Sequence, residues 1–236
     1  MKLAVIPARG GSKRIHRKNI RDFCGKPMIA WSIEAALESG CFDRVIVSTD
    51  DDEIAQVARE WGGEVPFVRP AELADDFTGT TEVVRHAIEL LEKSWTRPTF
   101  TCCIYATAPF IRPADIRSGL EILAGSTAPF CFTVTSYAFP IQRAVGINAT
   151  GHVEMFDASK FATRSQDLEE AFHDAGQFYW GRTDAWTAGL PIFSSQALPI
   201  KLPRHRVQDI DTAEDWRRAE LMRKVLQRET MAKEVN

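Results

Sequence analysis

Short apolar runs alternate with amphipathic segments along most of the chain. Residues 2–6 form an apolar run that ends at Pro7, which predicts a first strand. A polar loop follows, and Pro27 then suits the first turn of a helix whose apolar residues share one face until Gly40. The alternation predicts further strands at residues 44–48, 64–68, 99–105, 130–135 and 207–210, and further helices at 52–61, at 80–93 with Thr80 as its cap, from Pro113 onward, and at 212–228.

Strands that alternate with helices require crossover connections, which place the strands in parallel. We therefore expect a three-layer, Rossmann-like α/β fold with a mostly parallel sheet covered on both faces. Residues from about 140 to 186 interrupt the pattern, with a hairpin predicted at 146–156 and an aromatic strand at 177–180. We expect a single domain over residues 1–236, in which the interval of about 140–186 is an inserted lobe that forms a dimer contact or a substrate lid.

Composition narrows the class of protein. With 236 residues, of which 44% are hydrophobic, the chain can bury one substantial core. A net charge of −3 argues against general nucleic-acid binding, which usually needs a basic surface. No apolar run approaches the roughly 20 residues of a membrane helix, and no signal peptide is evident, so we expect a cytoplasmic protein. The five cysteines are odd in number and lack CxxC spacing, which favours reduced thiols over disulfides or a zinc site.

The loop from Ile6 to Asn19 concentrates glycine and positive charge directly after the first predicted strand. Gly10 and Gly11 let backbone N–H groups approach an anion closely, and Ser12 adds a hydroxyl donor. The loop contains neither a GxxxxGK[ST] nor a GxGxxG pattern, and its composition alone is equally typical of a solvated basic loop. Its position favours a phosphate site, because ligands of open α/β sheets lie at the carboxyl ends of strands. Its basic residues are Arg9, Lys13, Arg14, Arg17 and Lys18.

Two aspartates, Asp209 and Asp211, stand two residues apart near the C-terminus. In an extended segment such residues point to the same face, so both carboxylates can meet one Mg²⁺. A helix-capping role is the alternative, because Thr212 with Asp215 fits a capping box and Asp211 with Glu214 also fits a helix start. Capping explains Asp211 but gives Asp209 no role.

Six short motifs occur in order along nearly the whole chain. They are Ile6–Lys13, Lys18–Asn19, Gly25–Pro27, Val47–Asp50, Arg69–Pro70 and Asp209–Thr212. In this combination the chain resembles the acylneuraminate cytidylyltransferases, which activate nonulosonic acids as CMP-sugars. The resemblance implies the nucleotidyltransferase fold, CTP and a nonulosonic acid as substrates, Mg²⁺ as cofactor and a homodimer, without nucleic acid or membrane as partner.

The resemblance also implies residue roles. Lys18 lies beside the α-phosphate and stabilises the reacting centre, with Arg9 and Asp211 as further catalytic residues. Asp209 and Asp211 are the Mg²⁺ ligands. The nucleotide-binding residues are Arg9, Gly10, Gly11, Ser12, Lys13, Asn19 and Arg69, with the Asp76–Thr81 region and Thr80 within it.

Two segments depart from the sialic-acid branch of the family. Tyr105–Phe110 stands where that branch has Gln-Pro-Thr-Ser-Pro, and His173–Trp180 stands where it has Asn-Gly before an aromatic strand. Ala175 offers a sugar neither the donor nor the acceptor of an asparagine. Both segments are similar to those of a branch that activates pseudaminic acid. The resulting sugar-binding candidates are Tyr105, Thr107, Arg164 for the sugar carboxylate, His173, Gln177 and Tyr179; Arg164 also fits a surface arginine, and His173 a packing residue.

The implied reaction is attack by the anomeric hydroxyl of the sugar on the α-phosphorus of CTP, without a covalent protein intermediate. Either a metal-bound hydroxide or an aspartate can take the hydroxyl proton. Three alternatives stay open: N-acetylneuraminic or legionaminic acid as the sugar, a phosphatase-like hydrolase, and a non-catalytic nucleotide-binding domain. The absence of a DxD motif after the first strand weighs against the phosphatase.

Overall fold

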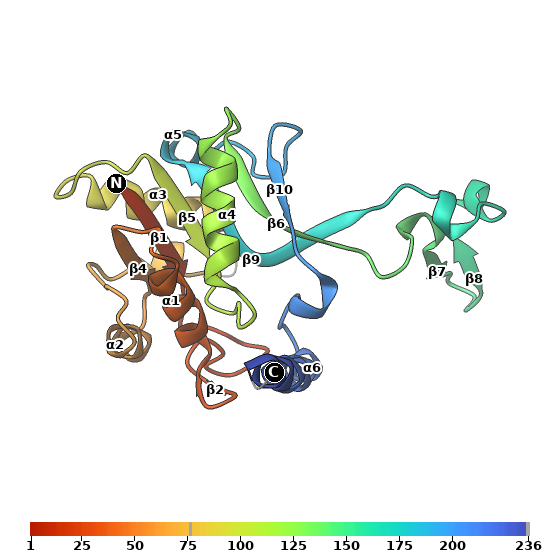
Figure 1. Cartoon of the computed structure of the whole chain (residues 1–236), viewed down its shortest axis with the longest axis horizontal. Helices are drawn as coiled ribbons and strands as arrows, with labels where there is room; N and C mark the ends of the chain where they lie inside the picture. The colour runs from red at the N-terminus through yellow and green to blue at the C-terminus, as the bar shows by residue number, and fades with distance from the viewer. Residues whose placement is uncertain (76, 235–236) are drawn as a thin grey trace.

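A central six-stranded sheet organises the protein, and the computed structural model describes residues 1–75 and 77–234 (Figure 1). In spatial order the strands are β10 (Leu198–Lys201), β6 (Phe130–Ser136), β9 (Phe172–Arg182), β5 (Phe100–Ile104), β1 (Lys2–Pro7) and β4 (Arg44–Ser48). β1 pairs in parallel with β4 and β5, and β10 pairs in parallel with β6. β9 runs antiparallel to both of its neighbours, β5 and β6. The mostly parallel sheet confirms the expected α/β fold.

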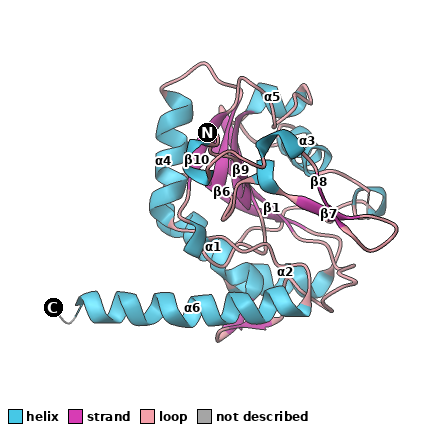
Figure 2. Ribbon diagram, turned by 90° about the vertical axis from the view of Figure 1, so that its right-hand side faces the viewer, coloured by secondary structure: helices cyan, strands magenta, loops and turns pink. Residues whose placement is uncertain are grey.

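Helices cover both faces of this sheet, as Figure 2 shows. One face carries α1 (Met28–Ser39), α2 (Asp52–Glu60) and α4 (Pro113–Ala124), and the other carries α3 (Thr80–Leu91) and α5 (Thr183–Thr187). β1 is buried between them: Leu3 and Val5 pack on the α3 side, and the alternate residues Ala4 and Ile6 on the α1 side. The three expected layers are therefore present.

Two of the predicted strands are wrong. At residues 64–68, only Glu64 forms a bridge, to Ile46. Pro66 follows two residues later, and since proline has no amide hydrogen it cannot continue a ladder. Residues 207–210 form no strand, and the last strand of the sheet is β10, which the sequence pattern missed because Pro199 interrupts it. β10 lies at the edge of the sheet, where a proline is tolerated.

Two further details differ from expectation. The helix cap before α3 is Gly79, and Thr80 is its first helical residue without a side-chain capping bond. The aromatic strand predicted at 177–180 is the centre of β9, which is 11 residues long. It belongs to the central sheet, so the part of the chain that departs from the sheet is shorter than the interval 140–186.

The C-terminal helix α6 (Ala213–Glu234) packs beside the first loop and runs out past the body of the molecule (Figure 2). A separate apolar cluster joins Trp216 and Ala219 of α6 to Ile15 of the loop and to Phe23. Phe23 lies in a small hairpin of β2 (Asp22–Phe23) and β3 (Lys26–Pro27). This cluster joins the loop after β1 to the C-terminal helix.

Residues 137–170, called the arm below, extend away from the sheet (Figure 1). The arm contains the hairpin of β7 (Val145–Ile147) and β8 (Val153–Met155), as expected, and no residue in this range is buried. Its exposed side chains include several large apolar ones. Three single-turn 3₁₀ helices, η2 (Ile141–Arg143), η3 (Ala158–Lys160) and η4 (Ser165–Asp167), complete it; two others lie in the body, η1 (Ala71–Leu73) and η5 (Arg204–Arg206). Within the described part of the chain, no helix combines the length and the apolarity that crossing a membrane would require.

Candidate active site

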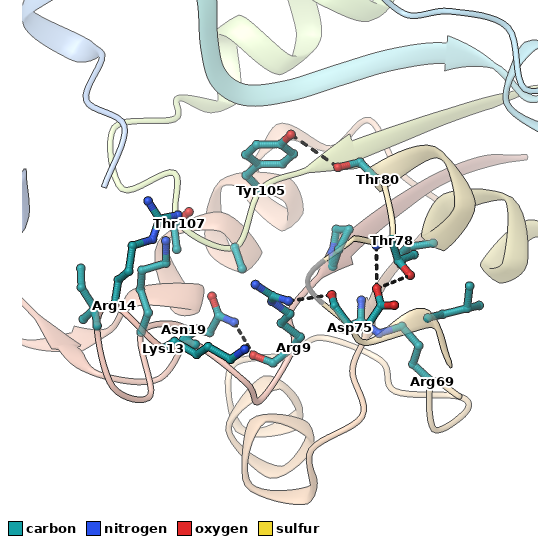
Figure 3. A pocket seen from close by; sticks show the side chains of 17 residues that line it. Arg9, Lys13, Arg14, Asn19, Arg69, Asp75, Thr78, Thr80, Tyr105 and Thr107 are labelled. Carbon is teal, nitrogen blue, oxygen red and sulfur yellow. Dashed lines mark hydrogen bonds between the residues drawn. The ribbon is translucent and has the colours of Figure 1, made fainter. Parts of the chain in front are cut away.

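A cavity of about 310 Å³ opens at the carboxyl ends of β1 and β5 (Figure 3). Among its described lining residues five are arginine or lysine, whereas Asp75 is the one carboxylate. Such a lining suits a polyanionic ligand. The structure brings together nine of the residues expected from the sequence, and these are Arg9, Ser12, Lys13, Lys18, Asn19, Arg69, Thr80, Tyr105 and Thr107.

The first loop is held over the sheet by three kinds of contact. The Ala8 amide donates to the Ser48 carbonyl at 3.0 Å, which extends the strand pairing of β1 by one residue. Ile15 is 4% exposed and anchors the loop in the cluster beneath α6. The Asn19 side chain donates to the Arg9 carbonyl at 2.9 Å and closes the loop on itself (Figure 3). Asn19 therefore shapes the cavity as well as lining it.

Gly10 is required by a close approach to the start of α2. Its amide donates to Asp50 Oδ1 at 3.1 Å, and a Cβ added there would lie 2.6 Å from Asp51 Oδ2. Gly11 is exposed with nothing within 4 Å of such a Cβ. Neither glycine lines the cavity, although both stand next to residues that do.

Arg17 ties the loop to the start of α2 and does not line the cavity. Its guanidinium donates to both carboxylate oxygens of Asp51 and pairs with Glu53. The hydrogen bond from Arg17 lowers the pKa of Asp51, which also caps α2 through the Ile54 amide at 2.9 Å. Arg17 therefore holds the loop against the start of α2, whereas the other four basic residues of the loop line the cavity.

Arg69 is a cation buried in the cavity wall. The residue is 4% exposed, and its Nη2 lies 3.4 Å from Asp50 Oδ1. Burial lowers the pKa of Arg69, and its Nε finds no hydrogen-bond partner among the described residues. A buried, under-bonded guanidinium beside a cavity favours a ligand that supplies hydrogen-bond acceptors.

Lys18 and Arg14 meet Asp211 from the other end of the chain. The Lys18 ammonium donates to the Ile210 carbonyl at 2.7 Å and to Asp211 Oδ1 at 3.3 Å. Arg14 lies 3.0 Å from Asp211 Oδ2. Ile210 is fully buried in the same apolar cluster as Ile15, and this packing holds the two segments in contact.

Asp209 and Asp211 are two carboxylates that lie close to Lys18. The pKa of Asp209 is raised, first by burial and then by the charge of Asp211, while Lys18 opposes the shift. No group of three or more His, Cys, Asp or Glu suited to a metal ion occurs in the described chain. Two repelling carboxylates fit Mg²⁺, which typically takes one or two carboxylates and completes its shell with water and phosphate oxygens.

The start of α6 is capped by other residues. Asp215 accepts from the amide of Thr212 at 2.8 Å and from its hydroxyl at 2.7 Å, and the Asp215 amide lies 3.2 Å from that hydroxyl. This reciprocal arrangement is the capping box expected for Thr212 and Asp215. The Asp211 carboxylate therefore pairs with Lys18 and Arg14 and does not cap the helix, and Asp209 takes no part in the cap.

Only two of the six sugar-binding candidates line the cavity. Tyr105 and Thr107 line the cavity, whereas His173 packs its ring against Tyr137 at 4.8 Å. Gln177 is 3% exposed and donates to the Arg206 carbonyl at 2.7 Å. Tyr179 is 2% exposed, and its hydroxyl donates to Asp174.

Arg164 lies in the arm, away from the cavity of the same chain. Its guanidinium pairs with Asp167, and its side chain is 71% exposed. The structure therefore does not bring Arg164 together with the other candidates within one chain.

The cavity also contains residues that the sequence did not single out. Asp75 accepts a bond from Arg9 through its carbonyl at 2.6 Å, and its carboxylate accepts from the Thr78 hydroxyl at 2.7 Å (Figure 3). Leu73 and Val83 supply apolar lining. The Asp-x-x-Thr spacing was a local signal for this turn, but nothing local places it opposite Arg9. Asp76, in the region expected to frame the pocket, lies outside the described residues.

Comparison with known proteins gives consistent similarities. The family described as "Cytidylyltransferase" matches residues 3–216. The chain is 46% identical over 223 residues to a pseudaminic acid cytidylyltransferase of Campylobacter jejuni subsp. jejuni serotype O:2, covering 94% of this chain and 96% of that protein. It is 45% identical over 123 residues to a CMP-N,N'-diacetyllegionaminic acid synthase of Legionella pneumophila subsp. pneumophila, covering 51% of this chain and 52% of that one. In fold it is similar to a CMP:2-keto-3-deoxy-manno-octonic acid synthetase complexed with CTP, with a TM-score of 0.68 at 22% identity over 94% of this chain and 98% of that one.

Proposed function

Because this chain belongs to the cytidylyltransferase family, we propose that it transfers CMP from CTP to pseudaminic acid and releases pyrophosphate. The observation that carries the proposal is the cavity, in which four cations of the first loop converge at the carboxyl ends of β1 and β5, namely Arg9, Lys13, Arg14 and Lys18. The near full-length similarity to a pseudaminic acid cytidylyltransferase supports the choice of sugar. Since CTP is a cytoplasmic metabolite, the reaction belongs in the cytoplasm.

The cations of the cavity bind the triphosphate. Arg9, Lys13 and Arg14 neutralise its charge, and the Ser12 hydroxyl and nearby amides donate to its oxygens. Arg69 and Thr80 line the wall on the side of α3, where they bind the nucleoside part.

Lys18 stabilises the charge that develops at the α-phosphate when the anomeric hydroxyl attacks. Its ammonium is held by two acceptors of the C-terminal segment, so it is positioned before the substrates bind. Lys18→Ala should abolish turnover and leave the melting temperature within a few degrees of the native value, because Arg14 still pairs with the Asp211 carboxylate, at 3.0 Å, when the ammonium group is removed. A variant that turns over at near-native rate would exclude this role.

Asp209 and Asp211 would hold Mg²⁺, which would neutralise charge on the phosphates when bound. Asp209→Ala should raise the Mg²⁺ concentration that gives half-maximal activity and weaken Mn²⁺ binding measured by electron paramagnetic resonance. Thr212→Ala, which removes the capping hydroxyl, is the matched control: it should lower the melting temperature without changing the metal titration. If the two variants give the same metal titration, the pair is structural.

The arm forms a homodimer contact that carries Arg164 to the cavity of the second copy. The exposed fractions of Phe139, Phe156 and Phe161 are 83%, 79% and 72%, and an arm with no buried residue gains a core only against another surface. Light scattering should show a dimer, and Phe156→Ser should shift it toward the monomer.

A mixing experiment tests whether Arg164 acts across the dimer. Lys18→Ala and Arg164→Ala protomers, each inactive alone, should regain about a quarter of native activity when unfolded and refolded together, because half of the dimers are mixed and each has one intact site. If Arg164 served its own chain, mixed dimers would stay inactive.

The assay that decides the function measures pyrophosphate release from CTP against a panel of nonulosonic acids. Pseudaminic acid should give the highest kcat/KM. Legionaminic acid is the second candidate, since the similarity to a CMP-N,N'-diacetyllegionaminic acid synthase is 45% over about half of the chain. Phosphate release without a sugar would indicate a hydrolase, and CTP binding without turnover a non-catalytic domain.

A further inference from the structure

The connection from β4 to α2, residues 48–51, is bonded to two segments that line the cavity. The Ser48 carbonyl accepts from the Ala8 amide at 3.0 Å, which holds the first loop. The Thr49 carbonyl accepts from the Arg69 amide at 2.8 Å, which holds the segment that carries this buried cation. The connection is therefore a common backbone support for the first loop and for the wall of the cavity that contains Arg69 (Figure 3).

Asp50 extends this support with its side chain. Its Oδ1 accepts from the Gly10 amide at 3.1 Å and lies 3.4 Å from Arg69 Nη2. One oxygen atom thus receives a donor from the phosphate-binding loop and a donor from the wall where the nucleoside part binds. Asp50 is not among the described residues that line the cavity, so it acts on a ligand through the loop and through Arg69. The motif Val47–Asp50 recurs in the family resemblance, and the contacts proposed above give it no role.

Arg69 depends on Asp50 for compensation of its charge and for its orientation. The Arg69 side chain is 3% exposed and that of Asp50 is 27% exposed. A guanidinium at this depth is costly unless a carboxylate compensates it, and within the described chain Asp50 is the carboxylate that lies within ion-pair distance. With Nη2 directed toward Asp50, the Nε of Arg69 has no hydrogen-bond partner among the described residues, and it is left for a ligand.

We propose that Asp50 is a positioning residue for the nucleotide, which fixes the Gly10 amide and the Arg69 guanidinium in one arrangement before CTP binds. This rests on the proposed function, and it assigns to the same site a residue that sets the affinity for CTP from outside the cavity. Charge alone predicts the opposite effect, because removal of a carboxylate near a cation-lined cavity strengthens the attraction of a triphosphate. Positioning requires an acceptor oxygen at the place of Oδ1, whereas compensation of Arg69 requires the negative charge.

Two substitutions of Asp50 separate the place of the oxygen from the charge. Asp50→Asn retains an acceptor for both donors and removes the charge, so it should lower the melting temperature and change the Kd of CTP by less than about threefold. Asp50→Glu retains the charge and moves the carboxylate by about 1.5 Å, so it should keep a melting temperature closer to native and raise the Kd about tenfold. A purely structural role would instead make affinity follow stability, with Asp50→Asn the worse variant for both.

Calorimetry with CTP in the absence of sugar measures the Kd of each variant. Steady-state kinetics should show the same change in the KM for CTP, with the KM for the sugar close to native. Asp52→Ala is the matched control, because it removes an exposed carboxylate two residues later, and it should leave the Kd within about twofold of native. Native affinity in Asp50→Glu, or a loss of affinity in Asp50→Asn as large as that in Asp50→Glu, would overturn the proposal.

If Asp50→Glu does not fold, Asp50→Ala takes its place in the comparison. Asp50→Ala and Asp50→Asn both lack the charge, and they differ in the acceptor. Asp50→Ala should therefore bind CTP about tenfold more weakly than Asp50→Asn. Equal or tighter binding by Asp50→Ala would show that charge governs the affinity, and the proposal would be wrong.

The amide proton of Gly10 gives a readout without substrate. Its NMR signal should lie downfield in the native protein and in Asp50→Asn, where the hydrogen bond to residue 50 is present, and move upfield in Asp50→Glu and Asp50→Ala. A signal that stays in place in all variants refutes the proposal even if the enzyme is active. A native protein that binds no CTP refutes the proposed function, and the Gly10 signal still decides whether Asp50 holds the loop.

Discussion

We expect Asp115→Asn to lower the free energy of unfolding more than Arg206→Met does, although the two substitutions break the same ion pair. Arg206 Nη1 lies 2.6 Å from Asp115 Oδ2, and Nη2 lies 3.4 Å from Oδ1. The Arg206 side chain is 9% exposed and that of Asp115 is 18% exposed. The pair joins the segment before Asp209 to the first turn of α4, so it also supports the site.

The asymmetry follows from what each partner keeps when it stands alone. Asp115 lies in the first turn of α4, where the helix dipole stabilises a negative charge, and it is the more exposed partner. Arg206 has no comparable second support and would be left as a buried, uncompensated charge. Asp115→Asn should therefore cost about 3 kcal/mol, and Arg206→Met about 1 kcal/mol. For a chain of this size the larger value corresponds to a drop in melting temperature of about 6 to 12 °C.

Equilibrium unfolding in urea, followed by circular dichroism, measures both values. Glu64→Gln is a surface control, because it breaks a pair whose Arg44 and Glu64 side chains are 44% and 38% exposed, and it should cost less than about 1 kcal/mol. If Asp115→Asn and Arg206→Met destabilise equally, or if Asp115→Asn costs no more than the control, burial does not govern this pair and the reasoning is refuted.

Three other outcomes are expected. Gly10→Ala should lower both the melting temperature and the affinity for CTP measured by calorimetry, because the added Cβ would lie 2.6 Å from Asp51 Oδ2 and displace Asp51, the partner of Arg17. Gly11→Ala is the control, and it should leave the melting temperature unchanged because its Cβ would have nothing within 4 Å. Since the Arg17 hydrogen bond lowers the folded-state pKa of Asp51, its stabilisation is complete above the unfolded pKa of about 3.9 and is lost as the pH falls through the folded value. Asp51→Asn should therefore flatten the pH dependence of the unfolding free energy below about pH 4, and an unchanged slope would mean that Asp51 is not responsible. Iodoacetamide at pH 8 should label Cys24 in the native protein and the other four cysteines only after denaturation, because those four are buried and burial raises the pKa of Cys131 to about 12. Mass spectrometry identifies the labelled residue, and rapid labelling of Cys131 in the native protein would contradict this expectation.

Local chemistry accounts for much of what could be predicted. The apolar run of β1, Pro113 in the first turn of α4 and Gly40 after α1 act through neighbours in sequence, and the structure has these elements where the pattern places them. The failures are also local in origin. Pro66 and Pro199 give the same signal, yet Pro66 prevents a strand, whereas Pro199 lies in an edge strand, where a proline is tolerated.

The composition of the first loop and its place after a strand predicted an anion site, and the motif order connected this loop with Asp209 and Asp211. Its partners in space were not recognisable. Lys18 reaches Ile210 and Asp211 across 192 and 193 residues because Ile15 and Ile210 share an apolar cluster, which no local pattern encodes. An aromatic strand pattern likewise cannot distinguish Tyr105, which lines the cavity, from Tyr179, which is 2% exposed.

By itself the sequence determined the class of fold and the family, and it predicted a phosphate site at the first loop, because these inferences depend on periodicity, turn residues and motifs that act over a few positions. The tertiary structure alone decided which candidates face the cavity, which are buried behind it, and which lie in the arm. The reason is physical: orientation and burial are set by packing between segments distant in sequence, and the irregular pairing of β9 turns Tyr179 toward Asp174 instead of toward the cavity.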